Sequence, residues 1–150
     1  MKQIPKVSII IPHHNNYSIL LDCIKSIYQS TFNDFEIIIV DNASSDSSIS
    51  KIIDKYPALN IIESSKNLGY AGGCNLGAKH SLAEYLFFLN NDTIIEPDCI
   101  KKLLNSFNKN KKISSLQPKI KNLSKRSYFD YAGASGGYID LFVFPFCRGR

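Results

Sequence analysis

The feature that most constrains the fold is an alternation between short apolar runs and segments of helical periodicity. Residues 7–11 and 35–40 are almost continuously apolar, as expected for parallel strands that are buried on both faces. Shorter apolar runs predict three further strands, at residues 60–63, 85–89 and 113–117. Strands that alternate with helices predict βαβ units, and hence an α/β fold with a mostly parallel sheet flanked by helices.

The segments between these runs carry helix signals. Pro12 is expected to end the first strand, and Asn16 or Ser18 to cap the first helix. Further helices are expected near residues 49–56, from the glycine-bearing stretch 67–77 to about His80, and after Pro97. The expected buried residues of these helices are Leu20, Leu21, Ile24, Ile27, Tyr28, Ile49, Ile52, Ile53, Leu103, Leu104 and Phe107.

Polar clusters follow the predicted strands at their carboxyl ends. They occupy residues 12–16, 41–46, 64–73 and 90–92. Ligands of open parallel sheets bind beyond the carboxyl ends of the strands. The sequence therefore predicts that these four clusters lie along one edge of the sheet and form a ligand site.

Three of the clusters carry groups with a definite chemistry. Asp41 can accept hydrogen bonds from a nucleobase or a ribose, or can close an Asx turn, and Asp46 is expected to cap a helix. The glycines of residues 67–77 allow a close approach of backbone to a phosphate, although their spacing fits neither GxGxxG nor GxxxxGK[ST]. Lys66 can pair with a diphosphate or, by default, stay solvated, and Gly77 is expected to serve packing only. Asp92 can bind Mg²⁺ or Mn²⁺, or can stand in an ordinary turn.

Composition excludes several classes of protein. The four cysteines form no CxxC pair, so we expect free thiols. No apolar run approaches the ~20 residues that span a bilayer, and no signal peptide is visible, so a cytoplasmic location is expected. The net charge of +5 suits an anionic ligand, whereas basic and aromatic residues do not interleave as in RNA-binding modules. We therefore expect no nucleic-acid partner.

The character of the chain changes after Pro118. Residues 119–126 are basic, residues 133–137 are glycine-rich, and residues 141–147 carry several large apolar side chains. Such a cluster would form a sticky patch if it stayed uncovered. We expect a first region at residues 1–117 and the start of a second region at 118–150, truncated before its end. Alternatively, the apolar tail packs back onto the domain.

Four segments, taken together, resemble the family 2 glycosyltransferases of GT-A fold. They are residues 7–12, 36–46, 67–75 and 89–93, in the order in which that family has its motifs. The tail from Gly133 to Arg150 is similar, more weakly, to rhamnosyltransferase-type members. His13 and His14 stand where the family more often has Thr-Tyr, and Asn90 stands at the first carboxylate of the DxD motif.

The resemblance implies a site for a nucleoside-diphosphate sugar. It implies the donor-binding residues Pro12, His13, Asn15, Asp41, Asn67, Gly69, Gly72, Gly73, Asn75, Asn90 and Asn91. It implies Asp92 as the ligand of a divalent metal, Mg²⁺ or Mn²⁺, that neutralises the leaving diphosphate.

The resemblance also implies an inverting transfer of a sugar, with rhamnose as one candidate, to a glycan or lipid-linked acceptor of a bacterial cell surface. The catalytic base is expected beyond residue 150, because Asp130 and Asp140 read as structural, so the chain alone should transfer little sugar. A lipid-linked acceptor would bring peripheral contact with the inner face of the membrane.

Two alternatives stay open. A nucleotidyltransferase shares the layout but needs an early glycine-rich and basic loop, which residues 12–16 lack. A non-catalytic nucleotide-binding or assembly module would keep the fold and use the apolar tail to form homo-oligomers.

Overall fold

The computed structural model describes residues 4–110, 112–130, 137–139, 141 and 145–147. The chain divides into two compact units, residues 1–97 and residues 98–150. Much of the glycine-rich and apolar tail, on which the rhamnosyltransferase resemblance and the oligomer alternative depend, lies outside the described residues. Within the described parts of the chain, no helix is both long enough and apolar enough to cross a membrane.

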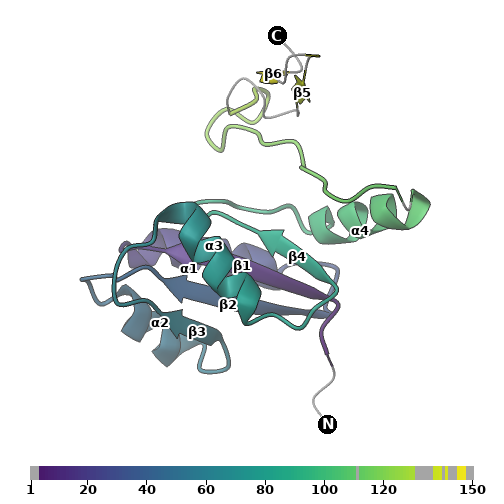
Figure 1. The fold of residues 1–150 in the computed structure, drawn as a ribbon. Helices are drawn as coiled ribbons and strands as arrows, with labels where there is room; N and C mark the ends of the chain where they lie inside the picture. The colour runs from purple at the N-terminus through teal and green to yellow at the C-terminus, as the bar shows by residue number, and fades with distance from the viewer. Residues whose placement is uncertain (1–3, 111, 131–136, 140, 142–144, 148–150) are drawn as a thin grey trace. The chain divides into compact units, whose positions relative to one another are not determined.

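The first unit is built on a four-stranded sheet in which every pair of neighbouring strands is parallel (Figure 1). Its strands are β1 (Val7–His13), β2 (Phe35–Asp41), β3 (Asn60–Glu63) and β4 (Tyr85–Phe88), in the order β3-β2-β1-β4. The predicted α/β fold with a parallel sheet is confirmed. All seven residues of β1 are buried, as its continuous apolar run predicted.

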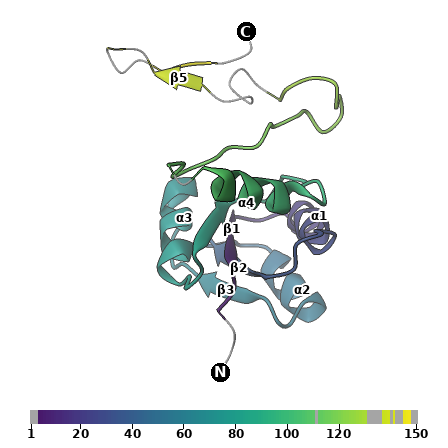
Figure 2. The same ribbon diagram turned by 90° about the vertical axis from the view of Figure 1, so that its right-hand side faces the viewer.

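Helices cover both faces of this sheet. They are α1 (Tyr17–Tyr28), α2 (Ser48–Lys55) and α3 (Gly69–Lys79). Figure 2 shows α3 on one side of the sheet and α1 and α2 on the other. A Cβ atom added to Gly77 of α3 would lie 2.4 Å from Cγ2 of Ile10 and 3.1 Å from Cγ2 of Val40. The packing role predicted for Gly77 is thus confirmed, because any larger side chain would push α3 off the sheet.

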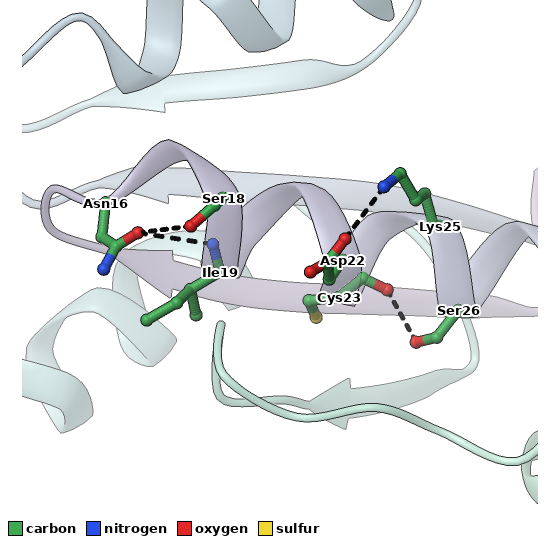
Figure 3. A network of polar contacts seen from close by, with 7 residues as sticks. All are labelled: Asn16, Ser18, Ile19, Asp22, Cys23, Lys25 and Ser26. Atoms are coloured by element: carbon green, nitrogen blue, oxygen red, sulfur yellow. Dashed lines mark hydrogen bonds and ion pairs between the residues drawn. The ribbon is translucent and has the colours of Figure 1, made fainter.

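Helix α1 begins at the cap that the sequence predicted. The Oδ1 atom of Asn16 accepts hydrogen bonds from the Ser18 hydroxyl (3.1 Å) and from the backbone N–H of Ile19 (3.4 Å), as Figure 3 shows. Further along the helix, the Ser26 hydroxyl donates to the carbonyl of Cys23 at 2.7 Å. The same Ser26 oxygen accepts the backbone N–H of Ile95 at 3.1 Å, which attaches the segment after β4 to α1.

The predicted buried faces are confirmed for most residues of the first unit. Leu20, Ile24, Ile27, Ile49 and Ile52 are buried. Leu21 is half-buried, and the prediction is wrong for two residues near helix ends. Tyr28 is 52% exposed and stacks on Tyr56 with ring centroids 5.3 Å apart, and Ile53 is 43% exposed. A position near the end of an amphipathic stripe can thus face solvent although it fits the period.

The prediction that Pro12 ends the first strand is wrong. β1 continues through Pro12 to His13, paired with β2 over its whole length. The carbonyl of Ile10 accepts Leu89 N–H at 3.0 Å, whereas the carbonyl of His13 accepts Asn42 N–H at 2.8 Å. The backbone groups of successive β1 residues therefore point alternately toward β4 and toward β2. Those of Pro12 point toward β4, whose pairing with β1 ends at Ile10. Its missing N–H breaks no ladder bond.

The second unit contains α4 (Cys99–Lys109) and an antiparallel pair, β5 (Gly137–Ile139) with β6 (Pro145–Cys147). Ile100 is the buried residue of α4, and Leu103, Leu104 and Phe107 are half-buried. The strand predicted at residues 113–117 is wrong, since these residues form no strand. Two apolar residues around a Ser-Ser pair, with Pro118 directly after them, supply too little side-chain packing to hold a strand in place.

The three cysteines whose side chains the structure describes, Cys23, Cys74 and Cys99, are free thiols, as predicted.

Candidate functional site

The carboxyl edge of the parallel sheet carries a cavity of about 290 Å³. Its lining comes from four separate segments: the carboxyl end of β1 with the residue after it, the turn after β2, the turn after β4, and the residues around the start of α3. The lining residues are Pro12, His13, His14, Asn42, Asn67, Gly69, Tyr70 and Asn91. Polar turns that are far apart in the sequence thus meet at one place, as the sheet-edge rule predicted.

Asn42 holds three of these segments together. Its backbone N–H donates to the carbonyl of His13 at 2.8 Å. Its side-chain Nδ2 donates to the carbonyl of Gly69 at 3.1 Å, and its Oδ1 accepts the N–H of Leu68 at 3.4 Å. Asn42 is only 4% exposed, so these bonds are shielded from water and fix the start of α3 against the end of β1.

Two glycines shape the start of α3. Gly69 has φ +68°, a left-handed conformation that side chains disfavour, and its N–H donates to Oδ1 of Asn67 at 2.8 Å. A Cβ atom on Gly73 would lie 2.8 Å from Cβ of Pro12 and 3.0 Å from Nδ2 of Asn42. The stretch 69–75 forms the first turns of α3, which confirms the helix predicted from the glycine-bearing stretch to about His80. Its N-terminal N–H groups start beside the cavity, an arrangement that suits an anion.

The turns after β1 and β2 are tied to each other. Oδ1 of Asn15 accepts the N–H of Ser45 at 2.8 Å, and the N–H of Asn15 donates to Oγ of Ser44 at 3.0 Å. Asn15 (φ 60°), Asn16 (φ 73°) and Ala43 (φ 60°) all have left-handed backbones. Strained conformations of this kind persist where the surrounding contacts determine them, often next to binding sites.

Two acidic residues have local structural contacts. Oδ1 of Asp41 accepts the N–H of Ser44 at 2.9 Å, which is the Asx turn left open as an alternative. Asp46 accepts the N–H of Ser48 at 3.0 Å at the start of α2, and the N–H of Asn16 at 2.8 Å. Hydrogen bonds from Ser48, first from its hydroxyl and then from its N–H, together with that from Asn16, lower the pKa of Asp46 to about 2.

The cavity brings together five of the residues predicted to bind a donor: Pro12, His13, Asn67, Gly69 and Asn91. Six other residues predicted to bind the donor are not part of the lining: Asn15, Asp41, Gly72, Gly73, Asn75 and Asn90. Asn75 is exposed on α3, and Cβ on Gly72 would meet Leu68 of its own helix.

Asp92, the predicted metal ligand, is an exposed carboxylate near the cavity. Burial is the main cause that raises the pKa of Tyr70 to about 12, and the charge of Asp92 contributes after Cys74. Burial and then Asp92 likewise raise the pKa of Cys23 to about 12, and the thiol of Cys23 donates to the carbonyl of Asn90 at 3.6 Å. The carboxylate of Asp92 therefore acts electrostatically on Tyr70, which lines the cavity.

In the described part of the chain, no three His, Cys, Asp or Glu side chains cluster as a ready-made metal site. A single exposed carboxylate fits a Mg²⁺ or Mn²⁺ ion that takes its other ligands from water and from phosphate oxygens. Such an ion would thus bind together with a diphosphate rather than before it.

Three lining residues, His14, Asn42 and Tyr70, were not among the donor-binding residues predicted individually. Asn42 is an uncharged residue next to Asp41, and Tyr70 is surrounded by glycines in the sequence. His14 forms a hydrogen bond through Nδ1 with the carbonyl of Asn42 at 3.0 Å. All three lie inside the polar clusters that the sequence marked. What could have identified them as lining residues is their position in these clusters rather than their residue type.

Comparisons with known proteins agree with this arrangement. The family model described as "Glycosyl transferase family 2" matches residues 8–139. A glycosyltransferase of Rickettsia felis is 32% identical over 142 residues, which cover 93% of this chain and 23% of that protein. The chain thus spans about a quarter of the length of that relative.

Solved structures share the fold. Residues 1–349 of TarS from S. aureus superpose with a TM-score of 0.74 at 21% identity, over 91% of this chain and 41% of that one. A mannosyltransferase of Pyrobaculum calidifontis, solved in complex with GDP-Man and Mn²⁺, gives a TM-score of 0.63 at 20% identity, over 80% of this chain and 35% of that one.

Proposed function

Because the chain belongs to glycosyl transferase family 2, we propose that the cavity at the carboxyl edge of its sheet binds the nucleoside diphosphate of a nucleotide-sugar donor. The observation that carries this proposal is the meeting of the turns after β1, β2 and β4 with the start of α3 around one cavity. The P. calidifontis mannosyltransferase, which shares the fold, binds GDP-Man and Mn²⁺.

The residues present suit an anionic, hydroxyl-bearing ligand. The N-terminus of α3 starts beside the cavity, where its dipole would stabilise the phosphates of such a ligand. Tyr70, whose pKa of about 12 keeps it protonated at neutral pH, supplies a phenolic hydroxyl that can donate. Asn42 and His13 keep the segments in place, so the cavity is formed before the ligand arrives.

A divalent metal fits next to Asp92. When bound, it would neutralise the charge that develops on the leaving diphosphate. Asp92 would hold this ion, and residues 1–117 would form the donor-binding region. The donor sugar, with rhamnose still a candidate, would pass with inversion to a hydroxyl of a glycan or lipid-linked acceptor. The acceptor and a cytoplasmic location with peripheral membrane contact are part of the proposal because the resemblance implies them.

Calorimetric titration with UDP, GDP and dTDP, each with and without Mn²⁺, tests the proposal. We expect one nucleotide to bind in a metal-dependent manner, and Asp92→Ala to weaken that binding about tenfold or more. Asp54→Ala, which removes an exposed carboxylate of α2, is the matched control and should bind as the wild type does. Absence of binding by all three nucleotides, or an unchanged affinity in Asp92→Ala, would refute the proposal. A stable oligomer without nucleotide binding would favour the assembly module instead.

A further inference from the structure

A chain of hydrogen bonds links the cavity to the start of α2. Nδ2 of Asn91 lies 2.9 Å from Nδ1 of His13, and Nε2 of the same ring lies 2.9 Å from Oγ of Ser48. The Ser48 hydroxyl then donates to Oδ1 of Asp46. His13 and Ser48 are each 1% exposed, so no water competes for the central bonds of this chain.

The direction of each hydrogen bond in this network follows from Asp46, which can act only as an acceptor. Asp46 is ionised at neutral pH and only accepts, so Ser48 must donate to it, and Oγ of Ser48 is left to accept from the ring of His13. The imidazole hydrogen is therefore on Nε2, and Nδ1 carries the lone pair that accepts from the Asn91 amide nitrogen. Burial lowers the pKa of His13, which favours this neutral ring.

The orientation of the Asn91 amide decides which group it can offer to a ligand. With one N–H of Nδ2 bound to His13, the amide keeps its carbonyl oxygen, its sole acceptor, and one further N–H for other hydrogen bonds. The opposite ring tautomer would place an N–H against the amide N–H and turn the amide over. A carbonyl oxygen accepts from a hydroxyl and repels a phosphate oxygen, whereas an amide N–H can donate to either.

We propose that His13 is a positioning residue, which the Ser48–Asp46 pair holds with its hydrogen on Nε2 so that Asn91 presents its carbonyl oxygen to a hydroxyl group of the bound nucleotide sugar. This inference rests on the proposed function of the cavity. The hydroxyl belongs either to the ribose or to the transferred sugar.

The first measurement needs no ligand. Long-range ¹H–¹⁵N NMR spectra of the ¹⁵N-labelled chain at neutral pH distinguish a protonated ring nitrogen from a bare one. We expect His13 to carry its hydrogen on Nε2 in the wild type and to lose this strict preference in Ser48→Ala. Ser50→Ala, on the exposed side of the same helix, is the matched control. A His13 ring with its hydrogen on Nδ1 in the wild type would overturn the inference.

The second measurement compares nucleotide binding in the same variants, with UDP against UDP-N-acetylglucosamine and GDP against GDP-mannose. Ser48→Ala should weaken binding about five- to tenfold, the loss of roughly one hydrogen bond, relative to Ser50→Ala. His13→Asn, which keeps an acceptor near the place of Nδ1, should bind better than His13→Leu. Weakening of the nucleotide and the nucleotide sugar alike identifies a ribose hydroxyl, and weakening of the nucleotide sugar alone identifies the transferred sugar.

Equal affinities in Ser48→Ala and Ser50→Ala for all probes would overturn the inference. If the wild type binds none of them, the proposed function fails and with it the role toward the ligand, while the NMR result still decides the tautomer and the orientation of Asn91.

Discussion

Replacement of Gly73 by alanine should damage both the stability of the first unit and its cavity. The added Cβ would lie 2.8 Å from Cβ of Pro12 and 3.0 Å from Nδ2 of Asn42, inside the 3.4 Å at which ordinary contact begins. Neither neighbour can retreat easily. Pro12 is fixed in β1, and Asn42 is held by its bonds to His13 and Gly69.

The expected size of the effect follows from two opposing terms. Overpacking of this kind costs about 1–3 kcal/mol, whereas Ala in place of Gly inside a helix recovers about 1 kcal/mol. Strain on the bond from Asn42 to Gly69 adds part of the roughly 1 kcal/mol that a hydrogen bond contributes. The free energy of unfolding should fall by about 0.5–2.5 kcal/mol in total.

Urea denaturation measures this loss, and a nucleotide titration measures the damage to the cavity. Gly77→Ala is the informative comparison, because its Cβ would meet Ile10 and Val40 near the C-terminal end of α3 rather than the cavity lining. Both variants should unfold at lower urea, but only Gly73→Ala should lose more nucleotide affinity than its stability explains. Lys79→Ala, at an exposed site of α3, should stay within about 0.5 kcal/mol of the wild type. Wild-type stability and affinity in Gly73→Ala would refute the close approach of α3 to β1.

Three further perturbations have definite expected outcomes. Ala43→Gly should raise the free energy of unfolding by about 0.5–1 kcal/mol in urea denaturation, because φ 60° is strained for alanine; a lower stability would contradict this. Asn42→Ala should lower it by about 1–3 kcal/mol, since buried backbone groups of Gly69 and Leu68 lose their partner, and an unchanged urea midpoint would be the contrary result. The pKa of Asp46 is about 2 in the folded chain against 3.8 ordinarily, so its contribution to stability is present above pH 4 and is lost as the pH falls toward 2. Urea midpoints between pH 5 and 2 should therefore fall less steeply in Asp46→Asn than in the wild type, and parallel profiles would contradict the hydrogen bonds drawn to Asp46.

The sheet was predictable because strands that are buried on both faces have continuously apolar sequences. The continuous apolar runs of β1 and β2 gave their positions to within one or two residues. The extension of β1 through Pro12 was not predictable from the run itself. It depends on which neighbour strand Pro12 faces and where β4 ends, and this is a property of the assembled sheet.

The candidate site was predictable in its place but not in its membership. Strand ends marked the four polar clusters, since parallel strands bring their carboxyl ends to one edge. Which side chains line the cavity depends on turn geometry. The side chain of Asn15 accepts a hydrogen bond from the N–H of Ser45, outside the cavity lining, whereas the side chain of Asn42 donates to the carbonyl of Gly69, which lines the cavity. Residue type alone carries no signal for that difference.

A crystal structure of the chain soaked with its nucleoside diphosphate and Mn²⁺ tests the central claim most directly. The account predicts the nucleotide in the cavity lined by Pro12, Tyr70 and Asn91, with the metal between Asp92 and the diphosphate. A nucleotide bound at any other surface, or a diphosphate in this cavity whose metal has no contact with Asp92, would contradict it.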